Sequence, residues 1–192
     1  SATATVDQVR GLLELLPGDT EVPLFVFDAG YDPIAIGWKL AGYRVQTLTR
    51  IREDRVFHAP PPARPNRPAG TGGRPPRHGP KMKCSEPATW PEPTAIHNTT
   101  DARYGTIRVT AWTDLHPRLS GRGHWANHDV LPIVEGTVIR VEVGHLPNPP
   151  ARTQQTLWLW HPGPHPPDLN LAWRAYLRRF DIEHTFRFIK NT

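Results

Sequence analysis

Apolar residues recur at helical spacing near the start of the chain and then form an unbroken run. The helical spacing predicts a helix over residues 3–16 and rests on Val6, Val9, Leu12, Leu13 and Leu16. Pro17-Gly18-Asp19 would end this helix. The run EVPLFVFDAG at 21–30 is typical of a strand buried on both faces of a parallel or mixed sheet. We therefore predict a helix and then a buried strand with Asp28 at its carboxyl end.

A second helix and a second strand follow. Pro33 suits the first turn of a helix, so residues 33–41 are predicted to be helical, with Gly42 as the stop. The run YRVQTLTRI at 43–51 predicts a strand. Strand, helix and strand in this order form the basic unit of an α/β fold, which is the fold class that we predict.

Later in the chain, short runs of alternating apolar and polar residues replace this pattern. TIRVTAW (106–112), TVIRVEV (137–143) and QTLWLWH (155–161) predict strands of an inserted antiparallel sheet. From Asp168, a good N-cap, to Lys190 the chain contains no Gly or Pro. This last segment predicts a long C-terminal helix.

Proline and positive charge are concentrated in the middle of the chain. Eleven of the 23 prolines lie between Pro60 and Pro93, and no acidic residue occurs from Arg55 to Ser85. Proline disrupts helices and central strands, so residues 58–93 are predicted to form an extended or disordered basic arm.

Within this arm, Gly73-Arg74-Pro75 resembles the core of an AT-hook, which lies in the minor groove of DNA. Arg74 and Arg77 are therefore candidate DNA-binding residues, and a solvated linker is the alternative. The chain divides into a core (1–57 and 166–192), the arm (58–93) and the β-rich insertion (94–165).

Composition excludes several classes of protein. Mean hydropathy is −0.51, and no run approaches the roughly 18 apolar residues of a membrane-spanning helix, so no membrane partner is expected. The single cysteine, Cys84, excludes an internal disulfide, and the first residues lack a secretory signal, so we expect a cytoplasmic protein. Neither Cys84 nor the pair His124 and His128 has the setting of a zinc site.

Five of the seven tryptophans are expected to serve packing. Trp38 and Trp173, on predicted helices, are expected in the core. Those on predicted strands are expected to pack against neighbouring strands rather than to stack on bases: Trp112, Trp158 and Trp160.

The predicted C-terminal helix carries one cluster of chemically active side chains. At about 100° per residue, four polar residues share an arc of about 60°: Tyr176, Arg179, Glu183 and Lys190. The apolar residues that would pack the helix down lie elsewhere on its circumference: Leu171, Leu177, Ile182, Phe188 and Ile189. A carboxylate can hold a metal ion, and Arg and Lys can hold phosphates. Alternatively, Glu183 is a surface residue paired with Arg179 or Arg187.

The motif Tyr176-x2-Arg179-x3-Glu183-x6-Lys190 resembles the Tyr-Arg-Glu-Lys signature of a large group of bacterial insertion-sequence transposases of the DDE type. Asp28-Ala29-Gly30-Tyr31 looks like the Asp-x-Gly-Tyr/Phe motif of the same group. The resemblance implies a ribonuclease H-like fold. It also implies two aspartates and a glutamate that hold two Mg²⁺ (or Mn²⁺) ions for phosphodiester chemistry.

Carried onto this chain, the resemblance makes Asp28 and Glu183 catalytic metal ligands and gives Tyr176, Arg179 and Lys190 contacts to the phosphates of the transposon end. The implied partner is double-stranded DNA, and a homodimer is compatible with it. The group's first aspartate lies on an earlier strand, whereas only a helix and a loop are predicted before Asp28. We therefore expect a fragment or a truncated gene product. An inactive DNA-binding fragment and an unrelated metal-dependent nuclease are the alternatives.

Overall fold

The structure, a computed structural model, describes residues 1–18, 21–62, 76–146 and 156–190, and for 180–190 it describes the helix without its side chains. The first half of the chain contains α1 (Ala2–Leu15), β1 (Leu24–Phe27), α2 (Pro33–Leu40) and β2 (Gln46–Ile51). These elements confirm the predicted order of helix, strand, helix and strand. Both strands start three residues later than predicted, and β1 also ends earlier, because a turn begins at Asp28.

The later elements include three strands that the sequence did not predict. These are β3 (Val56–His58), β4 (Lys81–Lys83) and β5 (Ala95–Asp101). The predicted strands correspond to β6 (Gly105–Pro117), β7 (Gly136–Val143) and β8 (Thr156–Pro162). Two short 3₁₀ helices, η1 (Pro87–Thr89) and η2 (Gly123–Trp125), and the terminal helix α3 (Leu169–Lys190) complete the described elements.

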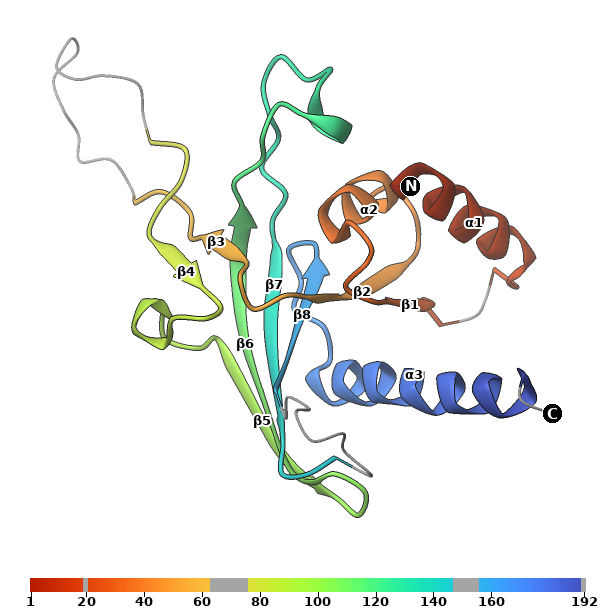
Figure 1. The fold of residues 1–192 in the computed structure, drawn as a ribbon. Helices are drawn as coiled ribbons and strands as arrows, with labels where there is room; N and C mark the ends of the chain where they lie inside the picture. Colours follow the sequence, from red (N-terminus) through yellow and green to blue (C-terminus); the bar gives the residue numbers. More distant parts are fainter. Residues whose placement is uncertain (19–20, 63–75, 147–155, 191–192) are drawn as a thin grey trace, which may run out of the picture.

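The described strands form one mixed sheet in the order β1-β2-β8-β7-β6-β3-β4, with β5 on the lower half of β6 (Figure 1). β1 and β2 are parallel, and every other pair is antiparallel. β8 pairs with β2 through Thr49↔Trp160, Arg50↔Leu159 and Ile51↔Trp158. The antiparallel strands therefore extend the sheet of the core rather than forming a separate sheet, because β8 pairs directly with β2.

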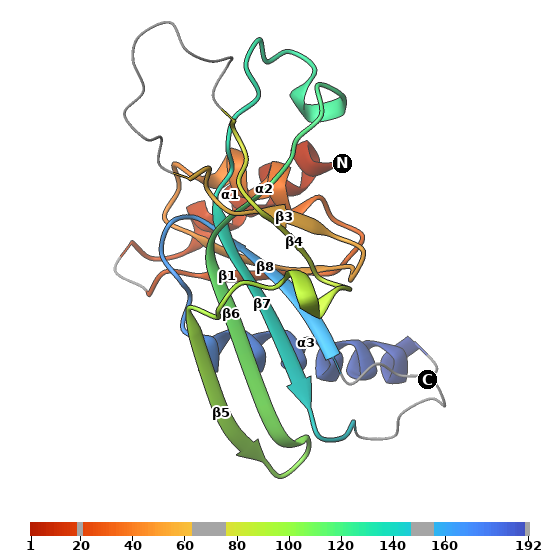
Figure 2. The same cartoon turned by 90° about the vertical axis from the view of Figure 1, so that its left-hand side faces the viewer.

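Helices cover the two faces of the sheet, as Figures 1 and 2 show. α1 and α2 lie on one face above β1 and β2, where Ile36 and Trp160 are completely buried. α3 lies across the other face, where Leu48, Ile139 and Leu159 are completely buried beside it. Successive strand residues alternate between these two cores, which is why one sheet supports helices on both sides.

Side-chain caps fix where α2 and α3 begin. Asp32 Oδ1 accepts hydrogen bonds from the backbone N–H groups of Ile34 (3.1 Å) and Ala35 (3.2 Å), with Pro33 in the first turn. Asp168 Oδ1 likewise accepts from Asn170 N–H (2.8 Å), which confirms the predicted N-cap. Each cap satisfies donors that a helix start leaves without intrahelical partners.

Part of the predicted arm is ordered and packs on the sheet. Residues 63–75, with Arg74, lie outside the described residues, but 76–93 form β4 and η1 and bury Met82 and Cys84. The prediction of an extended or disordered segment is therefore wrong for 76–93. A three-residue strand is too short to show a period, so its alternation around Met82 could not be recognised.

A histidine cluster (His58, His78 and His116) anchors the end of this arm. His78 Nδ1 and His116 Nε2 are 2.9 Å apart, and His58 lies opposite His116 in the β3–β6 pair. Burial, with His78 and His58 nearby, lowers the pKa of His116 to about 4. His116 is therefore neutral at pH 7, and its neutral imidazole can form a hydrogen bond with His78.

The backbone closes the arm beside this cluster. Ala59 N–H donates to Pro80 C=O at 3.0 Å, and Gly79 N–H donates to Ala59 C=O at 2.9 Å. A Cβ atom on Gly79 would lie within 3 Å of the backbone of Ala59 and Pro60, so only glycine fits there. The two ends of segment 60–78 are thus held next to each other.

The tryptophan predictions are confirmed except for Trp38. Trp173 is 3% exposed, and the three strand tryptophans are buried: Trp112, Trp158 and Trp160. Trp38 is 42% exposed, because the buried side of the short helix α2 is formed by Ile34, Ala35, Ile36 and Leu40. Its ring contacts Trp125 edge-on at a centroid distance of 6.1 Å.

The two faces predicted for the C-terminal helix are also partly wrong. Tyr176, assigned to a polar stripe away from the core, is completely buried against the sheet, and Leu171, assigned to the packing face, is 49% exposed. The described half of α3 packs on the sheet through Ala172, Trp173, Tyr176 and Leu177. A buried phenol requires a polar partner, and the sheet provides one.

Glycines in two helices give a matched test of the packing of α2. A Cβ on Gly37 would lie 2.6 Å from Pro162 Cβ, whereas a Cβ on Gly11 in α1 would meet nothing within 4 Å. We expect Gly37→Ala to lower the free energy of unfolding by about 1–3 kcal/mol through overpacking. Gly11→Ala should raise it by about 0.5–1 kcal/mol. Urea unfolding measures both, and a stabilised Gly37→Ala variant would show that α2 does not pack on Pro162.

Candidate active site at the carboxyl end of β1

Asp28 follows the last residue of β1 and begins a turn in which Tyr31 N–H donates to Asp28 C=O at 3.2 Å. β1 and β2 are parallel, so their carboxyl ends lie at the same edge. Side chains that bind ligands in α/β sheets commonly gather at such an edge. The carboxylate of Asp28 remains accessible, with 42% of its side chain exposed.

Two residues of α3 contact this carboxylate. The hydroxyl of Tyr176 donates a hydrogen bond to Asp28 Oδ1 at 3.4 Å, and Arg179 Nη2 lies 3.4 Å from Asp28 Oδ2. Tyr176 and Arg179 are one helical turn apart, so both reach the same point of the sheet. Three residues that the sequence analysis selected from two distant motifs are thus in contact.

Arg50 of β2 belongs to the same site, and the sequence analysis missed it. Leu48, two residues earlier, packs under α3, so Arg50 shares this face of the sheet. Its guanidinium lies beside both Tyr176 and Asp28 and affects the pKa of each. The signal was available, because Leu48 and Arg50 alternate at the carboxyl end of a strand predicted to lie near β1.

The surroundings of Asp28 keep its carboxylate ionised. Partial burial acts to raise the pKa of Asp28, but the N–H of Ala29 and the charges of Arg179 and Arg50 outweigh it, with a smaller contribution from Tyr176. The net effect is a pKa below the ordinary value of 3.8. Burial raises the pKa of Tyr176, so its hydroxyl remains a donor at neutral pH.

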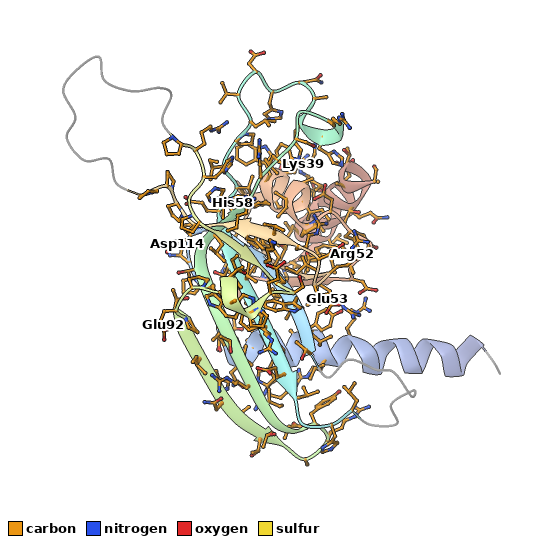
Figure 3. The ribbon with its side chains drawn as sticks, turned by 60° about the vertical axis from the view of Figure 1, so that its left-hand side comes forward. Lys39, Arg52, Glu53, His58, Glu92 and Asp114 are labelled. Carbon is orange, nitrogen blue, oxygen red and sulfur yellow. The ribbon has the colours of Figure 1, made fainter. Side chains whose placement is uncertain are left out.

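A hollow of about 350 Å³ opens beside the carboxylate. It is lined by Ala29, which follows Asp28, by Arg50 to Asp54 at the end of β2, and by Thr156 to Trp158 of β8. Arg52 and Glu53 project together on this side of the molecule (Figure 3). The site therefore combines an ionised carboxylate, guanidinium groups and open space at one sheet edge.

A family model described as DDE superfamily endonuclease matches residues 11–118, more than half of the chain. The chain belongs to the DDE superfamily of endonucleases. No curated protein and no solved structure matches it. The matched part of this DDE endonuclease domain includes Asp28 and Arg50 and ends one residue after β6.

The family implies DNA as the substrate, and endonucleases of this superfamily generally use divalent metal ions. Asp28 fits such a role, because its carboxylate is ionised and faces open space. Among the described residues, however, no three His, Cys, Asp or Glu side chains lie close enough together to hold a metal ion. The contact around Asp28 thus offers one carboxylate and two guanidinium groups, and the adjacent hollow adds Arg52, Glu53 and Asp54. None of the described helices is sufficiently long and apolar to cross a membrane.

The remaining candidate residues are only partly described. The side chains of Glu183 and Lys190, and all of Arg74, lie outside the described residues. Arg77 is half-buried, and its Nη2 donates to the C=O of Leu131. One donor of Arg77 therefore ties the end of the arm to the loop before β7.

The lowered pKa of Asp28 predicts how the protein's stability depends on pH. A carboxyl with a depressed pKa in the folded state stabilises the protein above its unfolded pKa of about 3.8 and loses this contribution as pH falls through the folded value. Asp28→Asn should therefore lower the free energy of unfolding at pH 7, by less than about 1 kcal/mol because the group is exposed to solvent.

Urea unfolding at pH 7 and pH 2.5 measures the effect, with exposed Asp129→Asn as the control. The difference between the wild type and Asp28→Asn should shrink at the lower pH. An equal difference at both pH values would contradict the ionic contacts assigned to Asp28.

Proposed function

We propose that this chain forms part of the catalytic domain of a DDE transposase of the bacterial insertion-sequence group, with a ribonuclease H-like fold. The contact of Asp28 with Tyr176 and Arg179 carries the proposal. It brings together an Asp-Ala-Gly-Tyr motif and the first half of a Tyr-Arg-Glu-Lys motif that lie far apart in the sequence. An unrelated surface aspartate would have no reason to meet both residues.

In this proposal Asp28 and Glu183 hold divalent metal ions, Mg²⁺ or Mn²⁺. Glu183 follows Arg179 by four residues, which is about 6 Å further along a helix on nearly the same side. Two bound ions would supply the activation of water or of a DNA 3′-hydroxyl for attack on a phosphodiester. Tyr176 fixes the Asp28 carboxylate by donating to Oδ1, which leaves the other oxygen to interact with a cation.

Arg179 and Arg50 would bind the phosphates of the transposon end, and Lys190 would extend this contact along α3. Arg179 pairs with Asp28 when no phosphate is present. A phosphate offers a guanidinium two oxygens in a favourable geometry. Arg179 can therefore exchange Asp28 for a DNA phosphate, which frees the carboxylate for a metal ion at the moment when substrate arrives.

A DNA-binding role without catalysis is the second candidate. The ion pair of Arg179 with Asp28 favours it, because a guanidinium occupies the carboxylate that a metal would need. In this role the cations of α3 and of the arm hold double-stranded DNA, with Arg74 and Arg77 as arm contacts. Metal binding distinguishes the two candidates, since only the first requires it.

Metal affinity should respond in opposite directions to two kinds of substitution at this site, of an acidic ligand and of the competing arginine. If Asp28 and Glu183 are ligands, Asp28→Ala and Glu183→Ala should each weaken Mn²⁺ binding by about tenfold or more. Arg179→Ala removes the competing cation and should tighten Mn²⁺ binding while it weakens binding to transposon-end DNA. Electron paramagnetic resonance of Mn²⁺ measures the first effect, with Asp129→Ala as the matched control. Unchanged Mn²⁺ affinity in Asp28→Ala and Glu183→Ala would contradict metal binding by these residues and would favour DNA binding without catalysis.

The arm can be tested through the salt dependence of DNA binding. Each phosphate contact on duplex DNA contributes about −0.9 to the slope of log K against log salt. Replacing both Arg74 and Arg77 by Ala should make that slope shallower by about 1 to 2. Lys39→Ala, which removes a cation of α2, should leave the slope unchanged. Fluorescence anisotropy with labelled duplex supplies the constants, and an unchanged slope for the arm variant would make the arm a linker.

A further inference from the structure

The outer edge of β5 is a free sheet edge. β5 pairs with β6 through all seven of its residues, from Ala95↔Ala111 to Asp101↔Gly105. In the part of the chain that the structure describes, no strand pairs with the other side of β5, which borders the sheet in Figure 2. Its outward backbone N–H and C=O groups form a row that another strand can pair with.

Natural proteins usually protect such edges with lysines, prolines, bulges or short strands, and β5 has none of these. Its sequence AIHNTTD carries one charge, Asp101, at the end. The bulge of β6 lies between Trp112 and Leu115, beyond the residues that pair with β5. β4, at one end of the sheet, is protected by contrast, since it has three residues of which two are Lys81 and Lys83.

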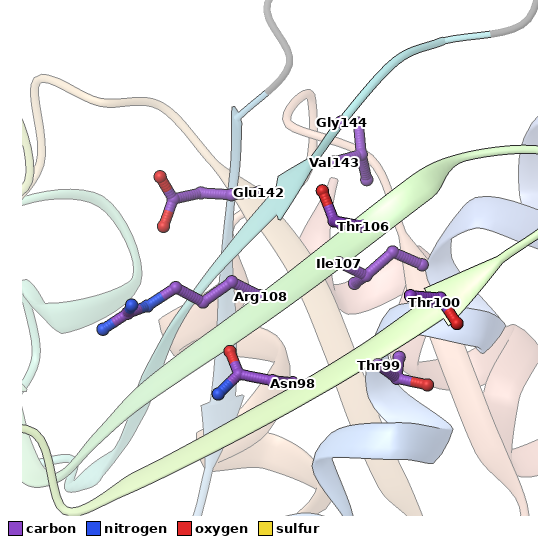
Figure 4. A pocket seen from close by; sticks show the side chains of 9 residues that line it. All are labelled: Asn98, Thr99, Thr100, Thr106, Ile107, Arg108, Glu142, Val143 and Gly144. Atoms are coloured by element: carbon purple, nitrogen blue, oxygen red, sulfur yellow. The ribbon is translucent and has the colours of Figure 1, made fainter.

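The face beside this edge is polar and open. Asn98 of β5, Arg108 of β6 and Glu142 of β7 project to the same side from three adjacent strands (Figure 4). They line a shallow hollow of about 610 Å³. Asn98 and Thr100 are both exposed there. The face of the sheet next to the outer edge of β5 is therefore open to solvent at these two residues.

We propose that β5 pairs with β5 of a second copy of this chain, antiparallel about a two-fold axis normal to the sheet. Residues directly opposite each other in antiparallel strands project to the same face. The two-fold axis therefore lies between the two copies of one residue, and that residue is opposite its own equivalent. Centring on Asn98 pairs all seven residues. Ile96 then faces Thr100 of the second copy, and Asn98 faces its own equivalent, where the two amides can exchange donor and acceptor.

The charges around β5 favour a second copy over another partner. Glu92 precedes the strand and is exposed near its start (Figure 3), and Arg103 follows the strand. In the Asn98-centred register, Glu92 of each chain lies within one residue of the position opposite Arg103 of the other. Each end of the paired edges therefore carries one negative and one positive charge from different copies. Asp101 faces Ala95 and not a second acid, so the paired edges carry no like charges.

The contact is small, because one pair of seven-residue strands buries much less than a standard protein interface. We therefore expect a weak dimer, with Kd on the order of 10 μM. This dimer does not depend on the nuclease or transposase assignment, so either can fail without the other. A test consequently needs a measurement that locates β5 in the contact and not only one that detects association.

Disulfide trapping locates it. The sequence contains one cysteine, Cys84, which is 2% exposed, and burial raises the pKa of its thiol to about 12, so an introduced thiol reacts alone. Opposed Cα atoms in an antiparallel pair are about 4.5 or 5.5 Å apart, within the range of a disulfide. Asn98→Cys should give a covalent dimer on mild oxidation of the 192-residue chain.

Thr106→Cys is the matched control, because Thr106 is exposed on the same face but lies on β6. In the proposed dimer the two copies of residue 106 are separated by three strand spacings, about 14 Å, which no disulfide spans. Cross-linking of Asn98→Cys at least about tenfold faster than Thr106→Cys supports the proposal. Equal rates, or no cross-link in either variant, would overturn it.

Sedimentation velocity supplies the second measurement. The wild type should show a concentration-dependent dimer between roughly 1 and 100 μM, on either side of the expected Kd. Asn98→Lys places two ammonium groups opposite each other and should raise Kd about fivefold or more at low salt, with partial recovery at high salt. Thr106→Lys should leave Kd unchanged. A wild-type monomer at about 100 μM, or a dimer indifferent to Asn98→Lys, would refute pairing through β5.

Discussion

The pairing of β8 with β2 is the interaction on which the rest of the structure depends. β1 and β2 alone are paired over four positions, too small a sheet to carry helices on both faces. With β8 added, Ile51, Trp158 and Trp160 join the core beneath α1 and α2, while Leu48 and Leu159 join the core beneath α3. α3 starts shortly after β8 ends, so the position of β8 beside β2 also directs where α3 crosses the sheet. The contact of α3 with Asp28 is therefore a consequence of the pairing of β8 with β2.

Local sequence patterns were sufficient to predict the elements whose buried residues recur at a regular spacing. α1, α2, the strand cores of β6, β7 and β8, and the start of α3 at Asp168 were all predictable, because their periodicity or capping is encoded within a few residues. β3, β4 and β5 were not, since three-residue strands have no period and AIHNTTD has few apolar residues. The burial of Tyr176 depends on a partner 148 residues away, and the exposure of Trp38 depends on which side of α2 packs on the rest of the molecule. In the candidate site, the motif residues Asp28, Tyr176 and Arg179 could be selected from the sequence, whereas Arg50 requires the parallel pairing of β1 and β2.

The site balances one carboxylate against two guanidinium groups within a partly buried edge. Burial acts to raise the pKa of Asp28, and the N–H of Ala29 together with the charges of Arg179 and Arg50 brings it below the ordinary value. The same cations also act to lower the pKa of Tyr176, but there burial dominates, so the pKa is raised and the phenol stays protonated. The two positive charges thus favour the ionised acceptor, Asp28, whereas burial keeps the donor, Tyr176, protonated. Such a site is prepared for an anionic ligand, because each guanidinium can exchange a protein carboxylate for an incoming phosphate.

The closed base of the basic arm has a consequence for how this protein can diverge. Ala59 and Gly79 hold the two ends of segment 60–78 together through backbone hydrogen bonds, so the chain leaves the sheet and returns to it at one point. The entropy of closing a flexible loop grows only with the logarithm of its length, about 0.6 kcal/mol for each doubling. Insertions and deletions between these anchors would therefore scarcely alter folding, whereas a single inserted residue in β6 or β8 would reverse which side chains face each core. Among descendants of this chain, the length and charge of the arm are free to drift while the sheet that carries it stays fixed.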